Sequence, residues 1–300
     1  MFSDRLRNTV HTKRASFPPL MKRFDHTAGT GFLVFDSPHS GTAYPDDFAH
    51  VCDRHALRRA EDTHVERIFE FATELNATLI AARFPRSYID VNRASDDIDV
   101  ELLDSRWPAP VMPSAKVRLG KGLVWRTLDD GTPIYGHPLA VSDVQRRINT
   151  CWHPYHIALQ EAVVEAVRRN GRAIHINCHS MPAVAAAFST DFPGEAHADF
   201  VLGDRDHTTA APELTTWMAA YLRQFGYSVS INHPYKGVEL VRRNGNPAAG
   251  IHSVQFEINK RLYMDEVTLE PHGGFAPLQS MLREMFAQLH TVRLPEGKLQ

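Results

Sequence analysis

The sequence predicts an α/β fold, because short and wholly apolar segments alternate with longer segments whose apolar residues recur at helical spacing. Residues 32–35 (FLVF) and 77–82 (ATLIAA) have the length and composition of strands that are covered on both faces of a sheet. Residues 46–76 and 141–170 carry the helical pattern. The 300 residues, of which 43% are hydrophobic, are enough for one large α/β domain or two small ones.

The composition argues against several classes of partner. The formal net charge is −2 and the isoelectric point is near 6.8, so we expect no binding to nucleic acid or to a membrane surface, and small molecules are the expected partners. The three cysteines, Cys52, Cys151 and Cys178, follow no repeated spacing, which argues against a disulfide framework and indicates a reducing compartment. The first residues are polar and no segment approaches the ~20 apolar residues of a membrane span, so a cytoplasmic protein is expected.

Residues 1–30 are expected to form an irregular arm that lies over the surface of the domain. The strand at residues 32–35 follows and leads into a loop of small and polar residues, DSPHSG. This strand therefore delivers His39 to the carboxyl edge of the sheet, where open α/β sheets place their ligands. Gly41 allows the backbone to turn close to the group that His39 faces. The alternative is an ordinary turn in which His39 caps a local group.

Two acids stand at the head of the first helical pattern, residues 46–76. The apolar positions of this pattern are Val65, Ile68, Phe69, Ala72 and Leu75. Glu61 and Asp62 precede them, and the helix dipole favours an acid at a helix start. The dipole explains one acid easily, but it explains Asp62 less well if His39 lies opposite.

Charged and amide side chains concentrate after the strand at residues 77–82. They are Arg83, Arg86, Asp90, Asn92 and Arg93. A guanidinium offers two parallel donors to a planar carboxylate, so these arginines suit a carboxylate ligand. The alternative is a surface cluster of salt bridges.

The middle of the chain is a long irregular stretch followed by a long helix. Residues 100–138 are rich in proline and glycine, and such a long loop predicts a lid or a pocket wall. The helix is expected over residues 141–170, with an interruption at Pro154 and an end at Gly171.

The third strand, residues 173–178, again leads into a histidine and a serine, His179 and Ser180. Two separate strands thus deliver a histidine to the same kind of loop. Two histidines and one carboxylate form a familiar shell for catalytic zinc, with one position left for water. His39, His179 and one acid of the 61–62 pair are therefore candidate ligands.

The C-terminal part continues the alternation. We expect strands at residues 199–203, 227–231 and 251–258, helices at residues 214–225 and 277–289, and a hairpin arm at residues 238–241. Glu257 is an acid between two apolar neighbours in the last of these strands. A buried carboxylate without a partner is costly, so Glu257 should meet a cation, a metal-bound water or both. The alternative is a structural salt bridge to Lys260 or Arg261.

A set of sequence blocks resembles the N-formylglutamate amidohydrolases, also called N-formylglutamate deformylases. In chain order the blocks read SPHSGTAYP, EDTHVERIFEFA, RSYIDVNR, WHPYHIAL, CHSMP, PYKG and GIHSVQFEINKRLYMDE. The resemblance covers most of the chain. It implies one domain over residues 31–300, similar to the zinc carboxypeptidases (phosphorylase/hydrolase-like), with a mixed central sheet flanked by helices. It also implies hydrolysis of an N-acyl amide on an acidic amino acid, with N-formyl-L-glutamate as the first choice.

The resemblance further implies a metal centre and its base. One zinc ion per chain would be bound by His39, Asp62 and His179, with Asp62 chosen over its neighbour Glu61. Glu257 would be the general base that accepts a proton from the attacking water.

Four residues would contact the substrate on the same grounds. Asn92 and Arg93 resemble the pair that holds a substrate carboxylate, Arg86 is a second clamp that also stabilises the oxyanion, and Lys236 belongs to the PYKG block. Asn177 departs from the family pattern, because an aspartate is expected two residues before the metal-binding histidine.

Residues 104–126 are also unlike the deformylase pattern, so the reaction class is better defined than the substrate. Three alternatives stay open: a hydrolase for a different N-acyl amino acid, a carboxypeptidase-like enzyme for small peptides, and a non-catalytic binding protein on the same fold. The loop at residues 100–138 favours a closed pocket over an open peptidase groove. The joint presence of the three ligands and the base argues against a protein without activity.

Overall fold

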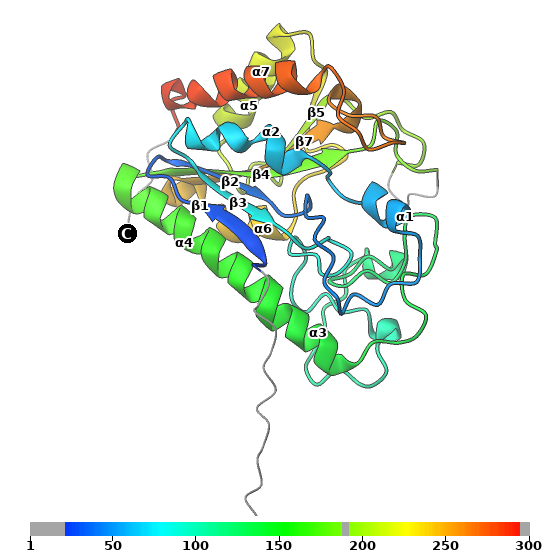
Figure 1. Ribbon diagram of the computed structural model, residues 1–300. Coiled ribbons are helices and arrows are strands. Elements are labelled where there is room, and N and C mark those ends of the chain that lie inside the picture. Colours follow the sequence, from blue (N-terminus) through cyan, green and yellow to red (C-terminus); the bar gives the residue numbers. More distant parts are fainter. Residues whose placement is uncertain (1–21, 188–191, 295–300) are drawn as a thin grey trace, which may run out of the picture.

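A mixed sheet of seven strands runs through the part of the chain that the structure describes (Figure 1). The computed structural model describes residues 22–187 and 192–294. Across the sheet the strands lie in the order β1 (Phe24–Thr27), β3 (Thr78–Ala82), β2 (Leu33–Ser37), β4 (Ala173–Met181), β7 (Ile251–Asn259), β5 (Phe200–Gly203) and β6 (Val229–Ile231). Strands β3, β2, β4 and β7 are parallel, whereas β1 and β5 are antiparallel to their inner neighbours and β6 is parallel to β5. The expected α/β fold with a mixed sheet is confirmed.

Helices cover both faces of this sheet (Figure 1). One face carries α2 (Val65–Ile68), α5 (Pro212–Gln224) and α7 (Phe275–Ala287). The other carries α3 (Val141–Arg147), α4 (His153–Asn170) and α6 (Glu239–Asn244), and α1 (Arg54–Arg59) packs into the same core through Leu57.

Alternate side chains of the central strands face the two helical layers. On β2, Phe35 packs against the rings of Phe69 and Phe286, with centroids 5.5 and 5.0 Å away, on the side of α2 and α7. Val34 joins the core on the opposite side. The same alternation places a stripe of buried polar side chains on that second face: Asp36 on β2, His175, Asn177 and His179 on β4, and Ser253, Gln255 and Glu257 on β7.

Two of the predicted strands extend farther than their apolar runs. β2 continues through Asp36 and Ser37 because these residues pair with β4 and β3, and β4 continues through His179 to Met181 because it pairs with β7. In register, His179 lies opposite Glu257. Part of the expected irregular arm, Phe24–Thr27, is a strand that pairs with β3; residues 1–21 lie outside the described residues.

The segment at residues 46–76 is not one helix. It holds α1, α2 and a 3-10 turn at Glu70–Thr73, and the predicted apolar face is nevertheless buried. The break follows from Asp62, whose N–H donates to the carbonyl of His39 (3.0 Å), and from His64, whose φ of 70° is left-handed. The loop between α1 and α2 therefore serves to carry Asp62.

Two other expectations are corrected. The hairpin arm expected at residues 238–241 is wrong, because α6 begins at Glu239; a short apolar run fits either element, and burial of Leu240 against the α4 side decides it. The long helix is interrupted by a π-turn at Ile148–Trp152, just before Pro154, and Gly171 ends it with φ 71°.

The long stretch at residues 100–138 is irregular, as expected, apart from two short 3-10 turns at Val100–Leu102 and Val117–Leu119. It contributes buried side chains, including Leu123, Trp125 and Ile134, to the core on the second face. This stretch is therefore packed against the core; a role as a lid or a pocket wall stays a prediction. Among the described helices none combines the length and the apolar character that a bilayer crossing requires.

Candidate metal centre and active site

His39 and Asp62 meet at the carboxyl end of β2. His39 follows this strand, and the backbone bond from Asp62 to the carbonyl of His39 holds the two loops together. Nδ1 of His39 lies 3.4 Å from Oδ2 of Asp62. The neighbouring acid, Glu61, instead accepts a hydrogen bond from the hydroxyl of Tyr44 (2.6 Å). The geometry thus favours Asp62 over Glu61 as the candidate ligand.

His179 completes the group from β4. Its Nδ1 lies 2.9 Å from the same Oδ2 of Asp62, and its ring is 4.7 Å from the ring of His39, centroid to centroid. One potential ligand atom from each of the three residues falls within 4.8 Å of the others. All three side chains are buried. The three residues that the sequence predicts as ligands are therefore brought together.

The far nitrogens of both imidazoles are held by other side chains. Nε2 of His39 is 2.6 Å from Oδ1 of Asp90, and Nε2 of His179 is 2.7 Å from Oδ1 of Asn177. In the tautomer that donates Nε2–H to these oxygens, each Nδ1 would present a lone pair to a metal ion held beside Asp62. Nδ1 of His39 is buried and has no hydrogen-bond partner among the described residues. Two imidazoles and one carboxylate in this arrangement fit a zinc ion.

Asn177 occupies the position where the family pattern has an aspartate, and the structure gives a physical reason. Its Nδ2 donates to Oδ1 of Asp36 (2.9 Å), while its Oδ1 faces His179. An aspartate here would set a second carboxylate against the buried Asp36. The amide instead links Asp36, which also bonds His175 (2.7 Å) and Tyr155 (2.7 Å), to the candidate ligand.

Arg86 bridges two acids of the centre. Its Nη1 is 3.7 Å from Oδ1 of Asp62, and its Nη2 is 3.1 Å from Oδ2 of Asp90. Burial by itself would raise the pKa of both carboxyls. The hydrogen bond from His179, with the charge of Arg86, instead holds the pKa of Asp62 well below its usual range, and the charges of His39 and Arg86 do the same for the pKa of Asp90.

Glu257 lies on β7 beside His179. It is buried, and Nε2 of Gln255 donates to its Oε1 (2.8 Å). Burial raises the pKa of Glu257, and the negative charge of Asp62 adds to this rise. The alternative salt bridges are not formed, because Nζ of Lys260 donates to the carbonyl of Glu61 (2.7 Å) and Arg261 pairs with Asp199 (2.8 Å). A buried carboxyl of raised pKa beside a candidate metal ligand suits proton transfer.

Apart from Arg86, the residues predicted to contact the substrate lie in different surroundings. Asn92 is buried, with Oδ1 accepting from the N–H of Leu240 (2.9 Å) and Nδ2 lying 3.1 Å from Nε2 of His179. Arg93 follows it and carries a buried Nε without an acceptor among the described residues. Lys236 is exposed and pairs with Asp206 (2.8 Å), so the described contacts do not join it to the centre.

Asp90 is a site residue that the sequence interpretation noted without a role. Like Glu257, it is an acid between apolar neighbours, here Ile89 and Val91, and the same argument about buried carboxylates would have marked it. The same argument does not mark Asp36, because the sequence predicts a loop there, whereas the residue lies in the buried strand β2.

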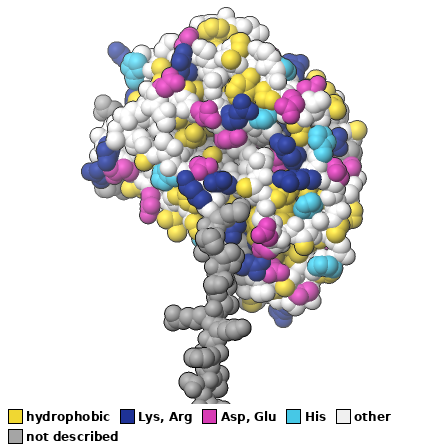
Figure 2. Space-filling view, viewed as in Figure 1, with side chains coloured by type: hydrophobic (Ala, Val, Ile, Leu, Met, Phe, Trp, Pro, Cys, Tyr) yellow, Lys and Arg dark blue, Asp and Glu magenta, His cyan; other side chains and the backbone are white. Residues whose placement is uncertain are grey.

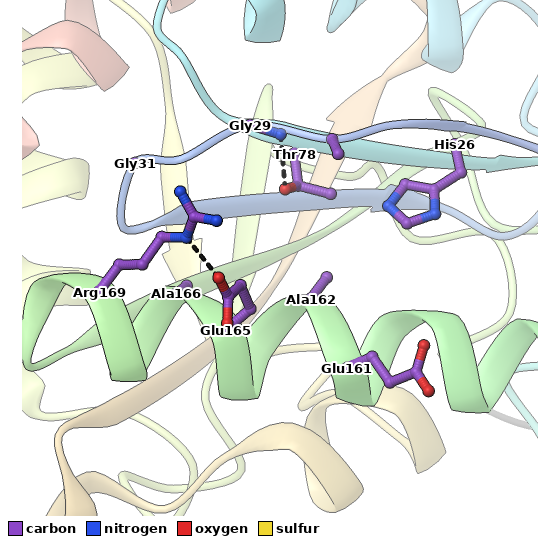
Figure 3. Close-up of a pocket in the computed structure, with 10 residues that line it drawn as sticks. His26, Gly29, Gly31, Thr78, Glu161, Ala162, Glu165, Ala166 and Arg169 are labelled. Atoms are coloured by element: carbon purple, nitrogen blue, oxygen red, sulfur yellow. Dashed lines mark hydrogen bonds and ion pairs between the residues drawn. The ribbon is translucent and has the colours of Figure 1, made fainter.

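A separate hollow lies between α4 and the turn that joins β1 to β2 (Figure 3). Gly29, Thr78, Ala162 and Arg169 are among its lining residues, and Arg169 pairs with Glu165 on the same helix. None of the candidate site residues lines this hollow. Basic and acidic side chains are interspersed on the face shown in Figure 2, which presents no broad basic surface.

Several known proteins are similar to this chain in sequence and in fold. Residues 32–264 match the model of the family described as N-formylglutamate amidohydrolase. The chain is 30% identical over 271 residues to an N-formylglutamate deformylase of Pseudomonas aeruginosa, with 89% of this chain and 94% of that protein covered. A crystal structure of N-formylglutamate amidohydrolase from Ralstonia eutropha JMP134 is 46% identical, with a TM-score of 0.84 over 91% of this chain and 99% of that one.

A structure of a gene product from Agrobacterium tumefaciens, 18% identical with a TM-score of 0.68 over 91% of this chain and 96% of that one, shares the fold. The resemblance that the sequence blocks carry is thereby confirmed. Since the family match spans most of the chain, the protein belongs to the N-formylglutamate amidohydrolase family.

Proposed function

We propose that the protein hydrolyses the formyl amide of N-formyl-L-glutamate to L-glutamate and formate, with one zinc ion per chain. The observation that carries the proposal is the buried group of His39, Asp62 and His179, in which both Nδ1 atoms face one carboxylate oxygen. The relatives named N-formylglutamate deformylase support the substrate. The three free cysteines support the expectation of a reducing compartment, the cytoplasm.

His39, Asp62 and His179 would hold the zinc ion, while Asp90 and Asn177 fix the orientation of the two rings. When bound there, zinc supplies Lewis-acid activation of a water and of the amide carbonyl.

Glu257 moves the protons of the reaction. Its carboxylate accepts a proton from the attacking water as the water oxygen bonds to the formyl carbon. It then donates this proton to the amide nitrogen as the C–N bond breaks, so that formate and the free amino group leave. Gln255 orients Oε1 for both transfers.

Two arginines bind negative charge during the reaction. Arg86 lies beside Asp62 and stabilises the charge that develops on the carbonyl oxygen. Arg93, whose Nε has no acceptor among the residues that the structure describes, binds the α-carboxylate of the substrate. Asn92, which lies against His179, would orient the same carboxylate together with Arg93.

A role for Lys236 in substrate binding stays a prediction. If its ammonium group guides the substrate at the surface, Lys236→Gln raises KM for N-formyl-L-glutamate a few-fold and leaves kcat unchanged. Steady-state kinetics of this variant measure both constants, and an unchanged KM would remove Lys236 from the site.

The test of the proposal is metal content by elemental analysis, paired with hydrolysis of N-formyl-L-glutamate before and after chelation. About one zinc per chain, and activity that chelation removes and zinc restores, are expected. N-acetyl-L-glutamate and a blocked dipeptide are the comparison substrates. Hydrolysis of the dipeptide in preference to the formyl amino acid would favour the peptidase alternative, and absence of both metal and activity would contradict the proposal.

A further inference from the structure

Buried hydrogen-bond donors without acceptors gather next to the candidate active site. In the described part of the chain, Nε of Arg86, Nε of Arg93 and Nε1 of Trp125 are buried and have no partner. A buried donor left unpaired costs about 1–3 kcal/mol, so such groups are expected to meet an acceptor in the functional state. Because all three are donors, the missing partner is rich in acceptors, as a carboxylate is.

The donors come from two segments that bind each other. Trp125 belongs to a turn in which Lys121 and Trp125 form an isolated antiparallel bridge. At the tip of this turn, Leu123 accepts a hydrogen bond from the N–H of Asp90 (2.7 Å). Since Asp90 also holds Nε2 of His39, the turn lies directly against the loop that supports the candidate metal ligand.

Lys121 brings a further cation to this place. Its Nζ is 5.2 Å from the centroid of the Trp125 ring, and Cζ of Arg86 is 4.9 Å from the same centroid. Burial and the positive charges of Arg86, Lys116 and Arg93 lower the pKa of Lys121 to about 8. Like charges are therefore crowded together, an arrangement that an added anion stabilises.

The acids that already pair with Arg86 and Lys121 do not prevent an added anion from pairing with Lys121. Asp62 and Asp90, the acids paired with Arg86, belong to the metal centre. Lys121 pairs with Asp129, but the side chain of Asp129 is 51% exposed, whereas that of Lys121 is 19% exposed. A substrate carboxylate can therefore approach Lys121 from the buried side, with Asp129 remaining in solvent.

The proposed substrate carries two carboxylates, of which Arg93 is assigned only one. We infer that Lys121, together with the indole N–H of Trp125, binds the side-chain carboxylate and so determines specificity for a dicarboxylic N-acyl amino acid. This inference rests on the proposed function. It gives the irregular stretch around residues 100–138 a role as the specificity wall of the pocket.

The test compares two substrates that differ only in the side-chain charge, N-formyl-L-glutamate and N-formyl-L-glutamine. Lys121→Gln is expected to lower kcat/KM for the glutamate substrate roughly 10- to 100-fold, the range of a hydrogen bond to a charged group, and to change the glutamine substrate less than about 3-fold. Lys121→Arg retains the charge and most of the preference. Trp125→Phe keeps the ring and loses only the N–H, so a several-fold decrease confined to the glutamate substrate is expected.

Arg118→Gln is the matched control, because it removes one exposed positive charge from the same stretch and should leave the preference unchanged. Equal decreases for both substrates in Lys121→Gln, or no decrease, would overturn the inference while leaving the deformylase proposal intact. Wild-type protein that hydrolyses neither substrate would overturn the proposed function, and the inference with it.

Discussion

The role that we propose for each side chain of the centre depends on which of its atoms already form hydrogen bonds. His39 and His179 both use Nε2 for an oxygen acceptor and turn Nδ1 to Asp62. Glu257 uses one oxygen for Gln255 and has no cation bonded to it among the described residues. The proposed division into ligands, orienting groups and a base rests on these contacts.

Glu257→Gln separates proton transfer from metal binding. The amide cannot accept the proton of the attacking water, so kcat is expected to decrease by about 10²–10⁴-fold with the zinc content unchanged. Steady-state kinetics and elemental analysis of the same preparation measure the two effects. The control is Glu270→Gln, which makes the same chemical change at an exposed glutamate in the C-terminal part of the chain. Near wild-type turnover in Glu257→Gln would mean that another group is the base.

Asn177→Ala removes the acceptor that orients His179. The ring then loses its fixed tautomer, and zinc affinity is expected to decrease about 10- to 100-fold. Titration against a metal buffer measures this affinity directly, without an activity assay. Asn170→Ala, at the exposed end of α4, should bind zinc as the wild type does. Unchanged affinity in Asn177→Ala would show that Asp62 and the protein frame position His179 unaided.

At the scale of elements, the sequence predicts where the strands lie. It does not predict how far the strands continue into the polar residues that follow their apolar part. Three of the four apolar residues at 32–35 lie in the buried strand β2, and residues 173–178 lie in the buried strand β4. The continuation of β4 through His179 depends on pairing with β7, which brings His179 opposite Glu257. A polar residue at the end of an apolar run looks like a loop residue until its partner on the next strand is known.

The short helices α1 and α2 likewise have ends that the sequence pattern does not predict. The apolar positions at helical spacing are buried, as predicted, but the backbone leaves the helix at His64 to bring Asp62 to His39. Periodicity reports which side chains are buried, whereas a contact between two distant loops decides where the helix stops.

Gly41→Ala tests the loop that carries His39. A Cβ at this position would lie 2.3 Å from the carbonyl oxygen of Phe84 and 2.5 Å from the carbonyl carbon of Arg83, so the loop has to move. Both zinc affinity and thermal stability are expected to decrease, because the loop is displaced from Asp62. Gly273→Ala is the control, since nothing lies within 4 Å of a Cβ there. Wild-type affinity and melting temperature in Gly41→Ala would contradict this account of the loop.

At the scale of the whole molecule, a bound metal would tie together three segments that are far apart in the sequence. His39 follows β2, Asp62 lies between α1 and α2, and His179 lies near the end of β4. These segments meet above the same edge of the sheet, and the buried polar stripe of β2, β4 and β7 lies beneath them. Metal binding is therefore expected to stabilise the native fold as a whole.

Chelation should lower the melting temperature, because zinc binds the native arrangement far better than the unfolded chain. With free zinc at about 1,000 times its Kd, the expected stabilisation is about 4 kcal/mol. Calorimetry of the protein with zinc and after chelation measures the difference, and Asp62→Asn should lose most of it. Equal melting temperatures with and without zinc would contradict a metal site in the native protein.

The sequence alone determined the α/β class, the buried faces and the residue types of the centre. It did so because apolar runs and helical spacing are local signals, and because the family blocks are contiguous. The choice of Asp62 over Glu61 came from the family resemblance, and the geometry favours it. Only the tertiary structure decided that Asp90 and Asn177 hold the rings and that Lys121 lies against Trp125. These facts depend on contacts between strands and loops far apart in the chain, which no local pattern specifies.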